Sequence, residues 1–224
     1  MKKFRISIFA SSILFFNNSV TAQNINWGSL QKNDRHVLNV NTSLEYGWIF
    51  GAGYGYQLKT KLPIVLSAEY SFPGGDMLLD DFKTKIGATF RFAKIDNFQF
   101  SAKLHGVFRR YENTLSRLVN FGSDMSVAGG HYKRKWHIAA EVGFDKAIVT
   151  HFKHSQAYKN NFPNVQDGWY EPSTGGNFYY GIQTGISFKQ HDIYLKAGRM
   201  LTQDFRTTPL IPFYAQLGYN LKFK

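Results

Sequence analysis

Two loop stretches contain the residue types that could carry out hydrolysis. They are His151, His154, Ser155 and Asp167 in one stretch, and Asp76, Asp80 and Asp81 in another. A nucleophilic side chain needs a base within hydrogen-bond distance and a third group that orients the base. No spacing along this chain enforces that arrangement, so we expect no catalytic residue. A barrel hydrolase acting on lipid or peptide is kept as the third hypothesis.

Metal and thiol chemistry find no support in the residue types. The seven histidines show no ligand spacing on one face, so no metal site or other cofactor is expected. The chain has no cysteine, which excludes a disulfide framework, thiol chemistry and a lipoprotein anchor.

Charged residues alternate with large apolar residues along much of the chain. Successive side chains of a β-strand point to opposite faces, so these charges share one face. Charges removed from water must be paired or hydrated, which predicts an ion-pair and water network that plugs a narrow lumen. A basic pore that favours anions is the alternative. The predicted network consists of Glu69, Lys83, Lys85, Arg91, Lys103, His105, Arg109, Glu141, Asp145 and Lys196, and His137, Lys153 and Lys222 fall in the same phase.

Several cations fall near the expected loop side of the strands. Lys146 and Arg199 lie in the outward phase, where a cation is tolerated only near the membrane interface. With Arg110, Arg117 and Lys153 they could contact lipopolysaccharide phosphates, to which arginine donates two parallel hydrogen bonds. Snorkelling, or a phase slip at a bulge, is an equal alternative.

The stretch 154–176 combines turn residues with aromatic ones. Tyr158, Phe162, Trp169 and Tyr170 could form a surface that binds an extracellular ligand, or they could pack down and cap the barrel.

The element that best defines the fold is the stretch 46–58. Its even positions, such as Trp48 and Tyr54, are large and aromatic, whereas its odd positions are mostly glycine. An apolar outside and a cramped inside are typical of a small closed barrel. Strands are expected at 37–42, 46–58, 64–72, 82–92, 98–109, 121–129, 136–152, 178–188, 193–198 and 213–223. This predicts an all-β, antiparallel up-and-down transmembrane β-barrel of ten strands, with eight as the alternative. A single long strand over 38–58 competes with the first hairpin.

Short and long connections alternate along the chain. The short ones are 59–62, 93–97, 133–135 and 189–191, and the long ones are 73–81, 110–120, 154–176 and 202–212. Because bacterial barrels have short periplasmic turns and longer extracellular loops, both mature termini are expected in the periplasm. Aromatic residues cluster near both ends of the strands, as interfacial girdles do, with Phe152 among those on the loop side. A soluble β-sandwich is the competing architecture.

The N-terminus has the features of an export signal. A basic start is followed by an apolar run and by small residues at Val20–Ala22, which predicts a signal peptide over 1–22 and a mature domain over 23–224. The stretch 23–34 is expected to be a polar lead-in. The formal charge is +12, and export favours anionic lipid head groups over nucleic acid as the partner.

Together the signal peptide, the alternation, the girdles and the terminal strand 213–223 resemble the small bacterial outer-membrane β-barrels, the group with the OmpA transmembrane domain and the OmpX-like and OmpW-like barrels. The chain departs from that group in placing Lys224 after the terminal aromatic Phe223. The resemblance covers the whole mature chain and implies an architecture and a cell outer membrane location in a Gram-negative bacterium. We therefore expect a monomeric, non-catalytic barrel with an envelope or surface-interaction role, in contact with lipid and lipopolysaccharide. A narrow porin-like channel for small solutes is the first alternative.

Overall fold

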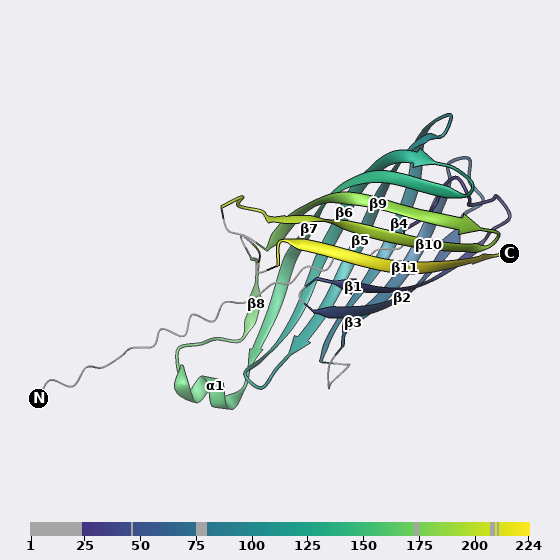
Figure 1. Cartoon of the computed structure of the whole chain (residues 1–224). Coiled ribbons are helices and arrows are strands. Elements are labelled where there is room, and N and C mark those ends of the chain that lie inside the picture. The colour runs from purple at the N-terminus through teal and green to yellow at the C-terminus, as the bar shows by residue number, and fades with distance from the viewer. Residues whose placement is uncertain (1–23, 46, 75–79, 173–174, 207–208, 210) are drawn as a thin grey trace, which may run out of the picture.

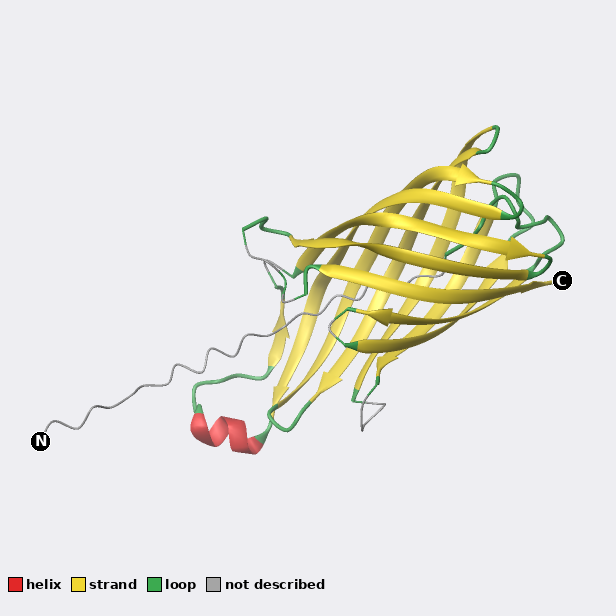
Figure 2. Cartoon of the chain, viewed as in Figure 1, coloured by secondary structure: helices red, strands yellow, loops and turns green. Residues whose placement is uncertain are grey.

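The chain folds into one closed barrel of ten antiparallel strands (Figures 1 and 2). The computed structural model describes residues 24–45, 47–74, 80–172, 175–206, 209 and 211–224. The barrel strands are β1 (His36–Leu44), β2 (Trp48–Gln57), β3 (Ile64–Pro73), β4 (Asp81–Ile95), β5 (Phe98–Glu112), β6 (Ser116–Tyr132), β7 (Trp136–His154), β9 (Gly176–Phe188), β10 (His191–Thr202) and β11 (Phe213–Phe223). Consecutive barrel strands pair with each other, and β11 pairs back onto β1. The predicted up-and-down ten-stranded barrel is therefore confirmed, and the eight-stranded, single-long-strand and sandwich alternatives are wrong.

The barrel turns its apolar residues outward and its polar residues inward. On β4, Lys85 is 1% exposed, whereas its neighbour Ile86 is 64% exposed. The same alternation runs through the other strands, because the period of two puts every second side chain in the lumen. In the described chain, no helix is long and apolar enough to cross a membrane.

The two ends of the barrel differ. At one end, called here the turn end, the strands are joined by residues 58–63, 96–97, 133–135 and 189–190. The opposite loop end carries α1 (Gln156–Asn161) and the short strand β8 (Gly168–Tyr170), which pairs with β7 and projects beyond the barrel in Figure 1.

One predicted loop is wrong. The stretch 110–120 is mostly strand, because β5 and β6 continue to a three-residue turn in which Asn113 Oδ1 accepts hydrogen bonds from the backbone N–H groups of Leu115 and Ser116. Its charged side chains suggested a loop, but strands that project into water can carry charges on both faces.

A bulge in β7 changes the phase of that strand near the loop end. Phe121 pairs with Val149 and Gly122 with Ala147, so Ile148 is an extra residue. The inserted residue exchanges the inward and outward positions that follow it. Phe152, predicted in the outer girdle, is therefore buried on the inner side, and Lys153, predicted in the lumen, is exposed on the outer side.

Aromatic side chains form a continuous row around part of the outer face near the loop end. Ring centroids lie 5.5 Å apart for Tyr70 and Phe82, 5.9 Å for Phe82 and Phe108, and 5.2 Å for Phe108 and Phe121. Trp169 of β8 extends the row, with its ring 6.1 Å from that of Phe121. Such a row is typical of a membrane–water interface.

Inward-facing glycines make room for tyrosine rings that cross the lumen. A Cβ atom on Gly218 would lie 2.1 Å from Cζ of Tyr194, and one on Gly143 would lie 2.2 Å from Cζ of Tyr179. Both tyrosines are 1% exposed. The glycines therefore allow large rings to fill the lumen of a narrow barrel.

Gly218→Ala is expected to lower the free energy of unfolding by about 1–3 kcal/mol, because the added methyl group overpacks the lumen and displaces the Tyr194 ring. The measurement is urea unfolding of the protein in lipid vesicles. Gly106→Ala is the matched control, since the nearest atom to its Cβ would be a carbonyl oxygen 3.8 Å away. Equal effects of the two substitutions would contradict this account.

Candidate functional site

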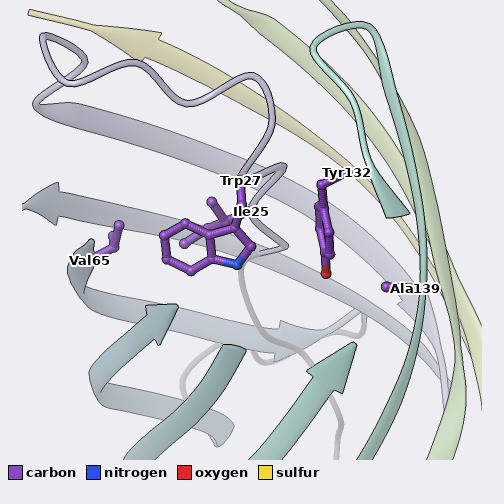
Figure 3. Packing of buried hydrophobic residues seen from close by; sticks show 5 residues of the cluster. All are labelled: Ile25, Trp27, Val65, Tyr132 and Ala139. Atoms are coloured by element: carbon purple, nitrogen blue, oxygen red, sulfur yellow. The ribbon is translucent and has the colours of Figure 1, made fainter. Parts of the chain in front are cut away.

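The N-terminal segment lies inside the barrel at the turn end. We call Asn24–Asp34 the plug segment; its first four residues are all buried. Ile25 and Trp27 pack with Val65, Tyr132 and Ala139 of the barrel wall (Figure 3). The expectation of a polar lead-in is therefore wrong, because the segment contributes Ile25 and Trp27 to an apolar cluster inside the barrel.

Hydrogen bonds fix the plug segment to several strands. Asn220 Nδ2 donates to the Asn24 carbonyl oxygen at 2.6 Å, and Asn26 Nδ2 donates to Ser187 Oγ at 2.7 Å. Lys222 Nζ lies 2.6 Å from Ser29 Oγ, to which it donates. Lys222 Nζ also lies 2.8 Å from a carboxylate oxygen of Asp192. Ser29 Oγ in turn donates to Asp192 Oδ1 at 3.3 Å, so the segment is held by β9, β10 and β11.

Next to the plug segment, five charged side chains cross the lumen; we call them the ion-pair layer. Its members are Lys85, Lys103, Asp124, Glu141 and Lys196. Lys85 Nζ lies 2.6 Å from an oxygen of Asp124. Lys196 Nζ lies 2.6 Å from an oxygen of Glu141. Lys103 Nζ lies between the two carboxylates, 3.4 Å from Asp124 and 3.5 Å from Glu141. All five side chains are at most 5% exposed, so each charge depends on its partners rather than on bulk water.

The structure places the ten residues of the predicted network on the inner face, but spreads them along the barrel. Arg91, near the turn end, donates to Gln99 Oε1 at 2.7 Å, and its guanidinium lies 6.0 Å from the ring centroid of Trp27. Arg109, near the loop end, lies 3.3 Å from Asp81. The buried remainder consists of Glu69, Lys83, Lys85, Lys103, His105, Glu141, Asp145 and Lys196.

Sequence reasoning missed Asp124, the acceptor at the centre of the ion-pair layer. Asp124 is fully buried and also accepts a hydrogen bond from the Tyr179 hydroxyl at 2.7 Å. The alternation of β6 could have identified it, because Asp124 lies between the outward-facing Ser123 and Met125. The apolar face of that strand is weak, so its alternation is hard to recognise.

Little space remains between the plug segment and the ion-pair layer. A cavity of about 30 Å³ is lined by Asn24, Ile25 and Trp27 on one side and by Lys103, Glu141 and Lys196 on the other. That volume holds roughly two water molecules. The plug segment and the ion-pair layer therefore face each other across this small cavity.

A serine and a histidine that sequence reasoning did not pair also meet in the lumen. Ser67 Oγ lies 3.0 Å from Nε2 of His105, which is the distance for a nucleophile and its base. The other ring nitrogen of His105 has no hydrogen-bond partner in the described residues, so no acid orients the ring. Since His105 is 1% exposed, a substrate has no access to this pair.

At the loop end, two of the residues considered for catalysis do meet. His154 Nδ1 lies 3.0 Å from Asp167 Oδ1, and the same oxygen accepts the backbone N–H of His154 at 2.9 Å. Lys159 Nζ lies 2.6 Å from the other carboxylate oxygen. Ser155 is not part of this group, because its Oγ accepts the backbone N–H of Tyr158 and caps α1.

These contacts lower the pKa of Asp167 well below its usual value. The largest cause is the backbone hydrogen bond from His154, followed by the hydrogen bond from Lys159. A carboxylate whose folded pKa is lowered stabilises the fold above its ordinary pKa, and the contribution is lost as the pH falls through the folded value. Asp167 is therefore ionised at neutral pH, and its contacts with His154 and Lys159 are fully formed there.

The remaining candidates for hydrolysis and metal binding are dispersed. His151 packs edge-on against the Trp169 ring on the outer face. Asp81 pairs with Arg109. Asp76 lies outside the described residues, and so do Tyr46 and the predicted signal peptide. Within the described ranges, no three His, Asp or Glu side chains gather in a metal-binding arrangement.

Three of the five predicted phosphate-binding cations lie together on the outer face. Arg110, Arg117 and Lys153 lie on β5, β6 and β7 near the loop end, where Arg117 pairs in register with Lys153. Arg110 forms an ion pair with Glu112. Arg199 is exposed on β10, away from this group, and Lys146 is already held by the Pro172 carbonyl oxygen and by Gln203 Oε1.

The four aromatic residues of the surface loop have different surroundings. The Tyr158 ring stacks on His154 and contacts Phe162, at centroid distances of 5.1 and 4.8 Å. Trp169 joins the outer aromatic row, whereas the Tyr170 ring meets Phe152 edge-on at 5.4 Å. Phe162, Trp169 and Tyr170 are exposed.

Comparison with known proteins extends only to the architecture. No family model matches the chain, and no curated protein matches it. Among solved structures, the N-terminal β-barrel domain of Pseudomonas aeruginosa OprF is 10% identical, with a TM-score of 0.42, over 85% of this chain and 98% of that one. The KdgM porin is 8% identical, with a TM-score of 0.44, over 84% of this chain and 99% of that one. Similarity at this level says nothing of a shared ligand or activity.

Proposed function

We propose that this protein is an outer-membrane β-barrel with a closed lumen, which acts through its cell-surface loops and catalyses no reaction. The observation that carries the proposal is that the plug segment and the ion-pair layer both lie across the lumen, with a cavity of only about 30 Å³ between them. A pore needs a continuous hydrated path, and these side chains occupy it.

The outer surface supports the membrane location. A soluble protein rarely exposes a large continuous apolar surface, whereas this barrel exposes apolar side chains around its wall and an aromatic row near one end. With short turns on the periplasmic side, the end of β11 and the entry to β1 both face the periplasm, and β8 and α1 face the cell exterior.

Planar-bilayer conductance tests the closed lumen. The purified protein is expected to insert without producing discrete current steps, since both layers must move before ions pass. Reproducible salt-dependent steps from the wild type would reject the closed-lumen proposal in favour of a narrow channel.

Lipopolysaccharide phosphates are the proposed partner of Arg110, Arg117 and Lys153. These cations lie beyond the outer aromatic row toward the loop end, where the proposed orientation puts the lipid head groups, and arginine donates bidentately to phosphate. Replacing all three by glutamine is expected to abolish the rise in the temperature of the gel-mobility shift that added lipopolysaccharide gives the wild type.

The matched control carries the same charge change at the turn end. Lys94, Arg134 and Lys135 are exposed there, and their replacement by glutamine is expected to leave the lipopolysaccharide effect intact. If both triple variants lose the effect equally, net charge rather than this site is responsible.

A further inference from the structure

A concave pocket lies at the loop end, between the end of β7 and the loop that contains β8. Its volume is about 560 Å³, within the range of roughly 300–1,000 Å³ that small-molecule sites occupy. It is lined by Phe152, His154, Asn164, Val165, Gln166, Tyr170 and Pro172. None of these residues contributes to the layers that close the lumen.

The walls of the pocket are held in place by contacts within the loop. Pairing of β7 with β8 sets Phe152 opposite Gly168 and brings the Phe152 and Tyr170 rings edge-on. The Tyr170 hydroxyl donates to the Gln166 carbonyl oxygen at 3.0 Å. A pocket with pre-ordered walls loses less conformational entropy when a ligand binds.

The polar groups of the pocket have no uncompensated charge. Asp167 engages Nδ1 of His154, which leaves Nε2 as the ring nitrogen available to a ligand. The charge of Asp167 is balanced by Lys159 at 2.6 Å. Asn164 and Gln166 add amide groups that can both donate and accept hydrogen bonds.

We propose that this pocket binds a neutral saccharide ring, which gives the proposed surface role a ligand class and rests on it. A sugar ring has apolar C–H faces that fit the Phe152 and Tyr170 rings, and hydroxyl edges that fit amide and imidazole groups. An acyl chain would fit the two aromatic rings but would make no use of the three polar side chains. No Lys or Arg is among the described residues that line the pocket, and the nearby Lys159 is held by Asp167, so an anionic ligand would gain little there.

Isothermal titration of the full-length protein in detergent tests the proposal. The probes are maltotriose, cellotriose and N-acetylchitotriose, with trigalacturonate and dodecanoate as the anionic and acyl-chain probes. At least one neutral trisaccharide is expected to bind saturably. Tyr170→Ala and Gln166→Ala are each expected to weaken that binding about tenfold, which corresponds to about 1.4 kcal/mol.

Trp169→Ala is the matched control, because Trp169 is on the same short strand but contacts Phe121 and His151 outside the pocket. Its saccharide affinity is expected to stay within about twofold of the wild type. Three results would overturn the proposal: no neutral trisaccharide binds, Tyr170→Ala leaves binding unchanged, or trigalacturonate or dodecanoate binds the pocket more tightly.

The two proposals fail separately. If the protein gives no current steps and binds no neutral saccharide, only the saccharide site is rejected. If the protein gives current steps and binds a neutral saccharide, and Tyr170→Ala weakens that binding, only the closed lumen is rejected.

Discussion

Asp124→Asn is expected to lower the free energy of unfolding by about 3–5 kcal/mol, the range found when one partner of a buried ion pair is removed. The substitution keeps the size of the side chain and an oxygen that can accept from Tyr179, but it removes the charge opposite Lys85 and Lys103. Lys103 and Lys196 then share Glu141, and Lys85 loses its partner at 2.6 Å. Urea unfolding in lipid vesicles, followed by tryptophan fluorescence, measures the change.

Two further variants separate charge pairing from general disruption. Lys85→Met combined with Asp124→Asn is expected to recover most of the loss, because it removes the ammonium group that lies 2.6 Å from the Asp124 carboxylate. Glu112→Gln, which breaks the partly exposed pair with Arg110, is expected to cost at most about 1 kcal/mol. If Asp124→Asn costs no more than Glu112→Gln, water rather than pairing stabilises the charges of the lumen.

Removing the plug segment together with three of the five side chains of the ion-pair layer is expected to turn a non-conducting barrel into a conducting one. Deletion of residues 24–34 empties the turn end but leaves the ion-pair layer across the lumen, so no current steps are expected from this variant. Adding Lys103→Ala, Glu141→Ala and Lys196→Ala removes the side chains on the other side of the small cavity. Discrete steps in planar bilayers are expected only from the combined variant.

The control for the combined variant removes the same charges outside the lumen. It joins the deletion to Arg110→Ala, Glu112→Ala and Lys159→Ala, and it is expected to remain silent. A heat-dependent shift in gel mobility verifies that each variant is folded. A folded combined variant without current would show that the closure lies elsewhere, and the two-layer account would be wrong.

Period-two alternation predicts the wall of this barrel because a closed sheet leaves each side chain only two directions. Lys85 and Lys103 lie on the inner face because their neighbours Ile86 and Leu104 face outward. Asp124 obeys the same rule, and it was missed only because the small residues of β6 gave that strand a weak apolar face.

The same rule fails where the chain leaves the regular register. One inserted residue, Ile148, turns Phe152 inward and Lys153 outward. No residue type in the sequence indicates such a bulge. The pairing of His154 with Asp167 depends on the path of a loop, so spacing along the chain could not reveal it. The contact of Asn24 with Asn220 joins segments without shared periodicity, and the plug segment was therefore taken for a lead-in.

The plug segment also has a consequence for the order of assembly. It runs directly into β1, whose pairing with β11 closes the barrel, and the hydrogen bond from Asn39 to Asn220 across that seam joins residues 181 positions apart. Pairing over such separations is slow, because the entropy of a long loop must be lost before any contact forms. Asn24 and Ser29 bond to Asn220 and Lys222 of β11 from inside the barrel wall. The plug segment therefore adds contacts of its own to the β1–β11 pairing that closes the barrel.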